Sequence, residues 1–353
     1  KAVAGAQVFV FRDRMIERGL DQTFDFTYSF RLPQSSSTLG TLKVIYLLAT
    51  ADIIIIDDYF GLLEYFYLPE KVKLIQLWHA GVGFKSIGYS RFGKYGSPKL
   101  HNAHRRYTYA IAGSDHLVDV YAEAFGVEKS AVIATGLPRI DTFLDAETAA
   151  AAVRGFEQAH PELSGKRIVL FAPTFRGRGI RDAYYDYDTI DFARWYDWCG
   201  DDTVVLFRMH HFVADPPPIP PQYRDRLIDA SGFGDTNNLL QVADILITDY
   251  SSIIYEYALL RRPMLFYSYD REVYAATRGF HHDFATTAPG KVCDTFDELL
   301  RALRDQDFET EKVDAFVAQN FNYVDTGSAD RVIDWLILGE PPRAQGDEHD
   351  RRK

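Results

Sequence analysis

A histidine followed by two glycines is the first group in this sequence that could do chemistry. His79 follows an apolar segment, residues 73–78, that is typical of a buried strand, and Gly81 and Gly83 come next. A neutral imidazole is a good general base near pH 7 because its pKa lies close to that value. Glycines let backbone N–H groups approach an anion closely. We therefore expect His79 to act as a base and Gly81 to lie against a substrate. The alternative is a histidine that caps or fills a tight turn.

Hydroxyl groups and carboxylates follow a second apolar strand, residues 244–248. These side chains belong to Thr248, Asp249, Ser251 and Ser252. We predict a helix over residues 252–260, and the first turn of a helix binds phosphate through unpaired N–H groups and a partial positive charge. Glu256 lies one turn along this helix, where a carboxylate can accept hydrogen bonds from ribose hydroxyls. The pattern predicts a nucleotide diphosphate site, and the alternative is an ordinary serine N-cap.

Basic side chains follow a third predicted strand, residues 204–207. Arg208 and His210 are two positions apart, so they share a face if the strand continues. Arginine and histidine on one face could clamp a phosphate. His211 adjoins His210, but neighbouring strand residues point to opposite faces and no carboxylate motif accompanies them. We therefore expect no metal there.

Two further segments could contribute donors. The strand predicted over residues 167–172 ends at Pro173, which cannot continue strand pairing, and Thr174 and Arg176 follow. The hydroxyl and the forked guanidinium suit phosphate, and the alternative is a helix start with solvated arginines. Arg139 lies in a turn between a strand and a helix, where it either reaches the same site or is a solvated loop residue.

These groups must be positioned by two series of alternating strands and helices. Further strands are predicted over residues 51–57, 109–112, 132–135 and 263–267, and helices over 117–124 and 145–160. Such alternation indicates parallel sheets in an α/β fold. We predict one domain over residues 1–150, a second over 151–340 and a disordered tail over 341–353. Ligands bind open sheets at the carboxyl ends of the strands, which predicts a site in the cleft between the domains.

Composition excludes several classes of protein. The chain has 353 residues, of which 47% are hydrophobic, so two globular domains are expected. Two cysteines exclude a disulfide scaffold or a Cys-rich metal site, and their usage fits a reducing compartment. We find neither a signal peptide nor an apolar run of about 18 residues that could span a membrane. The chain begins with Lys1 rather than Met, so we expect further residues upstream in a longer protein.

The charge of the chain and the absence of several known motifs argue against further classes of function. The net charge of −11 argues against nucleic acid as a partner. Residues 71–114 nevertheless contain eight Lys and Arg and no acid, and residues 166–181 contain five and no acid. These stretches indicate a specific anionic ligand or surface, unless acidic helices elsewhere balance them. No P-loop, dinucleotide-binding glycine fingerprint or nucleophile elbow is present, which disfavours P-loop kinases, classical dehydrogenases and serine hydrolases.

Several of these motifs, in this order, resemble the CDP-glycerol glycerophosphotransferase family, the polymerases and primases of teichoic acid and capsule polymers. They are Trp-His-x-Gly at 78–81, Ala-Pro-Thr-Phe-Arg at 172–176, Leu-x-Arg-Met-His at 206–210 and Asp-Ile-Leu-Ile-Thr-Asp-Tyr-Ser-Ser at 244–252. The similarity covers roughly residues 41–300 and includes 261–270 and 278–290. The resemblance implies a GT-B-like fold of two Rossmann-like domains that face a central cleft. The first domain would lie on the acceptor side and the second would bind the nucleotide donor.

The resemblance also implies an activity and roles for residues. Glycerol phosphate would pass from CDP-glycerol to a hydroxyl of a teichoic-acid-like or capsular polymer, with release of CMP. His79 would be the catalytic base, and Arg208 and His210 would bind the diphosphate and neutralise its charge. The nucleotide pocket would be lined by Thr248, Asp249, Ser251, Ser252 and Glu256 and completed by Pro173, Thr174 and Arg139. The family usually has His-Gly-Thr-Pro where residues 79–82 read His-Ala-Gly-Val, so the contact of that threonine near the acceptor is not assigned.

Expected partners and alternatives follow from this resemblance. No carboxylate cluster suited to Mg²⁺ is visible, so we expect no bound metal or other cofactor and a reaction that metal stimulates weakly or not at all. The partners would be CDP-glycerol and a polyol-phosphate or lipid-linked glycan acceptor. The basic residues 71–114 could bind the polymer or an anionic bilayer, which predicts a cytoplasmic protein at the inner face of the cell membrane. Three alternatives stay open: a CDP-ribitol donor, a GT-B glycosyltransferase that uses a nucleotide sugar, and a polymer-binding module without activity.

Overall fold

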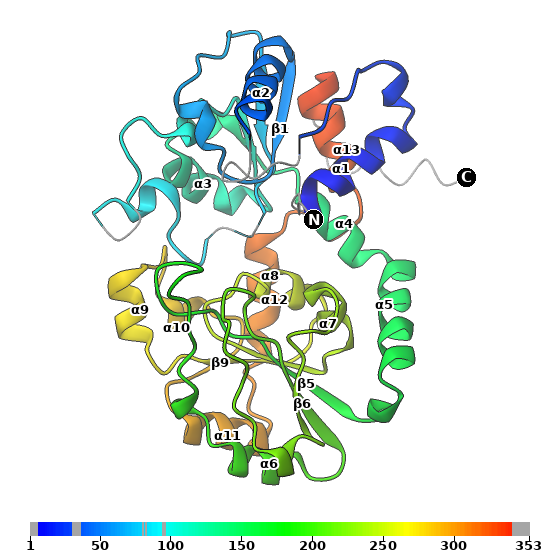
Figure 1. Ribbon diagram of the computed structural model, residues 1–353, viewed down its shortest axis with the longest axis vertical. Coiled ribbons are helices and arrows are strands. Elements are labelled where there is room, and N and C mark those ends of the chain that lie inside the picture. Colours follow the sequence, from blue (N-terminus) through cyan, green and yellow to red (C-terminus); the bar gives the residue numbers. More distant parts are fainter. Residues whose placement is uncertain (1–5, 30–36, 80, 82, 94–96, 341–353) are drawn as a thin grey trace.

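The computed structural model contains two parallel β-sheets, one above the other in Figure 1. It describes residues 6–29, 37–79, 81, 83–93 and 97–340. The tail predicted to be disordered, residues 341–353, lies outside the described residues. We call the part of the chain around the first sheet the first unit and the part around the second sheet the second unit.

The first sheet has four parallel strands that follow one another in space as they do in the sequence. They are β1 (Ile53–Ile56), β2 (Lys73–Gln76), β3 (Tyr109–Ile111) and β4 (Val132–Ile133). Their apolar side chains pack with those of α2 (Thr38–Thr50) and α3 (Val118–Phe125) in one hydrophobic cluster. Short apolar strands covered by helices are typical of parallel sheets. The four strands predicted in the first half of the chain are confirmed.

The second sheet has six parallel strands in a different order. From one edge to the other they are β10 (Lys291–Cys293), β9 (Met264–Tyr267), β8 (Ile245–Thr248), β5 (Arg167–Phe171), β6 (Thr203–Phe207) and β7 (Leu227–Asp229). The chain therefore adds β6 and β7 on one side of β5, and then β8, β9 and β10 on the other side. Ligands of open α/β sheets bind outside the carboxyl ends of the strands where the order reverses in this way. The motifs at 172–176 and 248–252 follow β5 and β8 and so lie at this reversal point.

Helices surround both sheets. Besides α2 and α3 they are α1 (Ala6–Glu17), α4 (Pro138–Leu144), α5 (Ala146–Ala159), α6 (Phe192–Cys199), α7 (Thr236–Val242), α8 (Ile254–Leu259), α9 (Arg271–Thr277), α10 (Phe284–Thr287), α11 (Phe296–Asp305), α12 (Glu311–Asn320) and α13 (Ser328–Arg331), which continues as a π-helix (Val332–Leu338). The strands β7 and β10 were not predicted. Each has three residues at an edge of the sheet, which is too short for a periodic pattern.

The two units are joined by α4 and α5. The helix predicted over 145–160 is confirmed as α5, whose first turn is capped by the Asp145 side chain accepting from the Thr148 N–H at 2.8 Å. In Figure 1 this helix runs down the outside of the second unit beside α7. The segment between the two sheets is thus a pair of helices rather than a flexible linker.

The end of the chain returns to the first unit. The Asp330 carboxylate accepts hydrogen bonds from Arg14 at 2.9 Å and Arg18 at 3.0 Å, and the Lys73 ammonium donates to the Leu336 carbonyl at 2.9 Å. Figure 1 shows α13 beside α1, far from the second sheet. The predicted second domain, residues 151–340, therefore includes a segment at 328–338 that packs on the first unit.

The largest hydrophobic cluster is shared between the units. It contains Phe84 and Ile111 from the first unit and Leu246 and Tyr255 from the second, all of them buried. Burial of apolar area contributes about 25 cal/mol per Å², so this shared core stabilises the two units against each other. The cleft expected between the units is accordingly bordered by a packed interface.

One buried carboxylate offers a test of this packing. Asp141 of α4 accepts hydrogen bonds from the backbone N–H groups of Ser328 at 3.0 Å and Ala329 at 2.7 Å. Asp141→Ala leaves both groups without a partner, so we expect the free energy of unfolding to fall by about 2–3 kcal/mol. Urea unfolding monitored by circular dichroism measures this loss. Asp119→Ala, which removes an exposed carboxylate of the same unit, is the control, and equal midpoints for the two variants would contradict the assignment.

Candidate functional site

His79 lies just beyond the carboxyl end of β2, exposed to solvent. Its Nδ1 is 3.2 Å from the carbonyl oxygen of Asp57 and 3.5 Å from the Asp58 carboxylate. A carbonyl oxygen can only accept, so the neutral ring carries its proton on Nδ1 and keeps the lone pair of Nε2. The Nε2 atom is therefore the one that can accept a proton, and this arrangement suits the predicted base.

Asp57 and Asp58 were not among the predicted site residues. They follow β1, the strand that pairs with β2, and parallel neighbours end at the same edge of a sheet. Burial raises the pKa of Asp57. The adjacent acids at the end of a predicted strand were the signal in the sequence that could have placed them beside His79.

An arginine and a buried carboxylate connect His79 to the second unit. Arg139 of α4 donates from one terminal nitrogen to the His79 carbonyl oxygen at 2.5 Å and forms an ion pair through the other with Glu256 of α8. Glu256 is 3% exposed, and its burial raises its pKa although Arg139 acts in the opposite direction. Arg139 therefore reaches the site, which was one of the two alternatives predicted for it. The Glu256 carboxylate faces this guanidinium rather than an open ribose pocket.

The loop after His79 rests on α8. A Cβ atom at Gly81 would lie 2.4 Å from the ring of Tyr255, so only glycine allows the two to approach this closely. The Tyr255 ring is buried and packs against Phe316 of α12. The close approach expected of Gly81 is therefore made to an aromatic ring of the second unit, and it sets His79 next to α8.

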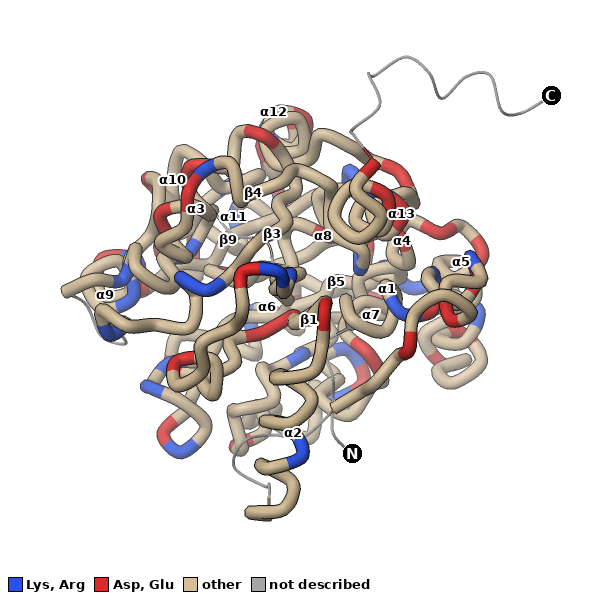
Figure 2. Tube along the Cα trace, turned by 90° about the horizontal axis from the view of Figure 1, so that it is seen from above, with Lys and Arg blue, Asp and Glu red and all other residues tan. Residues whose placement is uncertain are grey.

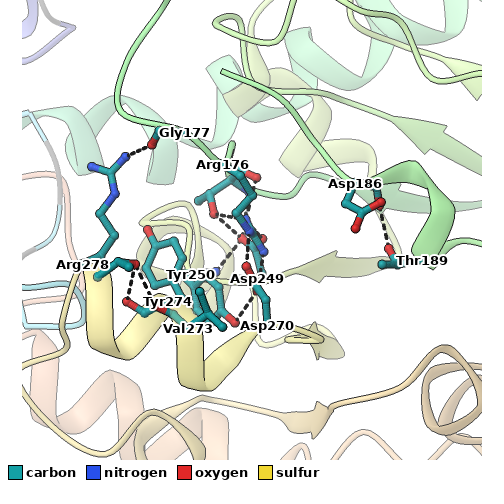
Figure 3. A network of polar contacts seen from close by, with 12 residues as sticks. Arg176, Gly177, Asp186, Thr189, Asp249, Tyr250, Asp270, Val273, Tyr274 and Arg278 are labelled. Atoms are coloured by element: carbon teal, nitrogen blue, oxygen red, sulfur yellow. Dashed lines mark hydrogen bonds and ion pairs between the residues drawn. The ribbon is translucent and has the colours of Figure 1, made fainter. Parts of the chain in front are cut away.

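The residues at the reversal point of the second sheet form a buried polar network (Figure 3). Asp249 accepts hydrogen bonds from the backbone and hydroxyl of Thr174 at 2.8 and 2.9 Å and from Arg176 at 2.9 Å. Arg176 also makes a two-pronged contact with Asp270, at 2.5 and 2.8 Å. The donors of Arg176, which were expected to face a phosphate, are thus taken up by two carboxylates.

Tyrosines surround the Arg176 guanidinium. Its central carbon lies 5.2–5.8 Å from four ring centroids, those of Tyr185, Tyr250, Tyr269 and Tyr274. Aromatic faces attract cations at such distances. Burial disfavours the charge of Arg176, but Asp249 and Asp270 outweigh it, so the pKa of Arg176 is raised. The network therefore holds the loop that begins at Asp249 in place.

Helix α8 begins later than predicted. Its N-cap position is Ile253, so neither Ser251 nor Ser252 is the N-cap, and the Ser251 hydroxyl accepts from the Ile253 N–H at a long 3.4 Å. Both serines are partly exposed, whereas Thr248 is fully buried and donates to the Ala172 carbonyl at 2.7 Å. The two serines are therefore the accessible hydroxyls of this motif.

Arg208 and His210 have different surroundings. β6 ends at Phe207, so the shared strand face expected for the two residues does not form. Arg208 donates to the carbonyl oxygens of Ala230, Ser231 and Gly234 at 3.1, 2.6 and 2.9 Å and thereby holds the loop before α7.

Pro173, which was predicted to help complete the nucleotide pocket, is buried next to Thr174.

His210 is a neutral donor. Its Nδ1 accepts from the Phe212 N–H at 3.2 Å, which leaves the proton on Nε2. Burial lowers the pKa of His210 to about 4, with smaller contributions from His211 and Lys85. His79 and His210 therefore offer opposite capacities at Nε2, a lone pair in the first case and an N–H group in the second.

Lys85 was recognised in the sequence as part of a basic stretch but not as a site residue. It forms an isolated antiparallel bridge with Phe280, and the neighbouring Ser86 N–H donates to Gly279 at 3.1 Å. These contacts place Lys85 of the first unit within electrostatic reach of His210. Lys85 and Phe280 are about 195 positions apart in the sequence, so no local pattern could predict their contact.

No three His, Cys, Asp or Glu side chains in the described ranges gather in a way that could hold a metal ion. Among the helices of the same ranges, none has the length and apolarity that crossing a bilayer requires.

Comparison with known proteins gives the family. Residues 19–338 match the model described as CDP-Glycerol:Poly(glycerophosphate) glycerophosphotransferase. The chain is 39% identical over 341 residues to the teichoic acid poly(ribitol-phosphate) polymerase of Bacillus spizizenii, covering 95% of this chain and 54% of that protein. It is 38% identical over 325 residues to the teichoic acid ribitol-phosphate polymerase TarL of Staphylococcus aureus, covering 91% and 58%. The chain thus spans little more than half the length of these two relatives.

A glycerol-phosphate enzyme is less similar in sequence. The teichoic acid glycerol-phosphate primase of Bacillus spizizenii is 27% identical over 308 residues, which cover 84% of this chain and 76% of that protein.

Solved structures show the same fold. A variant of the wall teichoic acid polymerase TagF superposes with a TM-score of 0.74 at 22% identity, covering 94% of this chain and 85% of that one. A UDP-N-acetylglucosamine 2-epimerase gives 0.54 at 12% identity, covering 95% and 89%. These likenesses confirm the predicted GT-B-like α/β fold with two parallel sheets. Because the family model matches most of its length, the chain belongs to the CDP-glycerol:poly(glycerophosphate) glycerophosphotransferase family.

Proposed function

We propose that this chain transfers a polyol phosphate from a CDP-polyol to a hydroxyl of a polyol-phosphate polymer and releases CMP. The observation that carries the proposal is the placement of His79. Its Nδ1 contacts the Asp57 carbonyl, and its loop rests on α8, directly after the serines at the reversal point. A base is thus held beside the edge of the sheet where a nucleotide diphosphate would bind.

We propose CDP-ribitol as the donor, in place of the CDP-glycerol that the sequence first suggested. The two ribitol-phosphate polymerases described above are 38–39% identical to this chain, whereas the glycerol-phosphate primase is 27% identical. CDP-glycerol is the second candidate. Differences of this size in sequence support the choice of donor without identifying the residues that read the polyol.

The transfer is an in-line displacement at the phosphorus next to the polyol. The acceptor hydroxyl attacks this phosphorus while Nε2 of His79 takes its proton, and the bond to the bridging oxygen breaks so that CMP leaves with the electron pair. Such reactions need mainly positioning and stabilisation of charge. The Nε2–H of His210 and the hydroxyls of Ser251 and Ser252 are the donors that we assign to the diphosphate oxygens.

The other predicted residues support these groups. Thr174, Arg176 and Asp249 hold the loop before α8 in place through the buried network, and Thr248 ties β8 to the end of β5. Arg208 orders the loop before α7. We assign Arg139 and Glu256 to positioning of the His79 loop, because both are occupied by each other and Arg139 by the His79 carbonyl.

Replacement of His79 tests the base. His79→Ala is expected to lower kcat by about 100- to 10,000-fold while the dissociation constant of CDP-ribitol changes less than about threefold, since a general base acts on the transition state. Rates of CMP release and isothermal titration calorimetry measure the two quantities. His116→Ala, at an exposed histidine of the same unit, is the matched control. Equal losses in turnover and donor affinity would remove His79 from this role.

The choice of donor is tested by the product. Incubation with a polyol-phosphate oligomer and either CDP-ribitol, CDP-glycerol or a UDP-sugar is followed by mass analysis. We expect extension by ribitol phosphate, with kcat/KM roughly tenfold or more above that for CDP-glycerol, because the pocket must distinguish polyols by their hydroxyls. Transfer from the UDP-sugar would support a glycosyltransferase instead. The absence of CMP release with every donor would support a binding module.

An exposed apolar helix face favours contact with a membrane. Leu39, Leu42 and Tyr46 of α2 are 78, 57 and 66% exposed, and their spacing places them on one side of the helix. Figure 2 shows α2 standing out from the body of the protein. The sequence of this helix contains one basic residue, Lys43, and no acidic one. Together with the basic residues 71–114, this face supports peripheral binding to an anionic bilayer, which we propose for the protein.

Substitutions on α2 test this contact. Leu39→Asp combined with Leu42→Asp is expected to lower flotation with vesicles that contain phosphatidylglycerol by about tenfold, because it places charge in the apolar layer. Val273→Asp, at an exposed apolar residue of the second unit, is the control. Activity on a soluble oligomer should remain. Unchanged flotation of the double variant would show that α2 does not contact lipid.

A further inference from the structure

Two basic side chains of the second unit contact Phe175, and a lysine of the first unit lies within electrostatic reach of one of them, His210. Lys85 lies in the loop after His79, Arg278 follows α9, and His210 follows β6. The Arg278 guanidinium carbon is 5.6 Å from the centroid of the Phe175 ring, and the His210 ring is 4.7 Å from it. Residues separated by more than 190 positions in the sequence are thus gathered at one place.

Hydrogen bonds to the backbone bring together the segments that carry Lys85 and Arg278. Lys85 forms its bridge with Phe280, and the His281 N–H donates to the Phe84 carbonyl at 3.2 Å. Arg278 donates from one terminal nitrogen to the Gly177 carbonyl at 2.6 Å. Figure 3 shows its guanidinium at Gly177, apart from the network of Arg176 and Asp249. Within the described ranges its other N–H groups have no hydrogen-bond acceptor, so they are available for a ligand.

The cations of this cluster have no acidic partner in the part of the chain that the structure describes. Among the described residues, no carboxylate forms an ion pair with Lys85 or Arg278, although both side chains are partly buried. Arg139 and Arg176, two further arginines near the site, are each paired with a buried carboxylate, and Arg208 donates to three carbonyl oxygens. Partly desolvated cations are unfavourable unless an anion offsets them. The cluster is thus suited to an anionic ligand.

We propose that Lys85 and Arg278, with the Nε2–H group of His210, form a phosphate-binding subsite between the two units. The fork of an arginine, the compact charge of a lysine and a neutral imidazole donor suit the oxygens of a tetrahedral phosphate. The inference rests on the proposed function, because His210 also serves the donor diphosphate there. The phosphate belongs either to that diphosphate or to a phosphodiester of the acceptor polymer.

The subsite has a consequence for the arrangement of the units. Lys85 belongs to the first unit and Arg278 to the second, so one bound phosphate would neutralise charge from both. The repulsion between the two cations is replaced by attraction to a shared anion. Binding therefore strengthens the contact between the loop after His79 and the segment after α9.

The experiment compares Lys85→Ala and Arg278→Gln with two controls, Lys99→Ala and Arg301→Ala, whose side chains are exposed on the first and second units. Calorimetry measures the dissociation constants of CDP-ribitol, of a poly(ribitol phosphate) oligomer and of inorganic pyrophosphate. We expect Lys85→Ala and Arg278→Gln each to weaken at least one ligand by roughly tenfold, with a reduced dependence on salt, because a charge contact is lost. The controls should change affinity less than about twofold, as expected for screened surface charges.

The pattern of losses identifies the source of the phosphate. A loss confined to CDP-ribitol and pyrophosphate assigns the subsite to the donor, and a loss confined to the oligomer assigns it to the acceptor. Unchanged affinity for all three ligands in both variants would overturn the proposal. Arg278→Lys keeps the charge and should recover most of the binding, which separates loss of charge from loss of the Gly177 contact.

Failure of the proposed function would look different. If the wild-type protein transfers no polyol phosphate but binds pyrophosphate, and the two variants weaken that binding, the subsite stands and the proposed reaction fails. If the wild-type protein is active and the two variants bind every ligand normally, the reaction stands and the subsite is refuted.

Discussion

Glu256 is almost fully buried in α8, and the cation that balances its charge comes from the other unit. Arg139 forms this ion pair and also donates to the carbonyl oxygen of His79. Separation of the units would leave a buried carboxylate without its partner, which is strongly unfavourable. The position of His79 relative to the reversal point of the second sheet therefore depends on this pair, and the packing of Gly81 on Tyr255 reinforces it.

The polar residues at the reversal point of the second sheet form two groups. One group is buried and supports the loop before α8, and the other is partly exposed on that loop. The carboxylates Asp249 and Asp270 neutralise Arg176 inside a ring of tyrosines, and this network holds the loop before α8 in place. Ser251 and Ser252, which lie on this loop, remain partly exposed. The buried cation Arg176 is thus occupied by carboxylates, and the groups left accessible on the loop before α8 are neutral hydroxyls.

The strands and the placement of the motifs at their carboxyl ends were predictable, because runs such as residues 53–56 and 245–248 are apolar and rich in β-branched residues. The partners of Arg176 and Arg139 were not, since Asp270 is 94 positions from Arg176 and nothing local marks either pairing. The start of α8 was predicted too early because serine at the end of a strand is a common cap, whereas here Ile253 takes that position. The order of the strands in the second sheet likewise arises from contacts that no local pattern contains.

The chain passes between the units twice, once through α4 and α5 and again after α12, before 328–338 pack beside α1. The two connections meet where Asp141 of α4 accepts hydrogen bonds from the N–H groups of Ser328 and Ala329. A displacement of one unit relative to the other therefore acts on both connections at the same place.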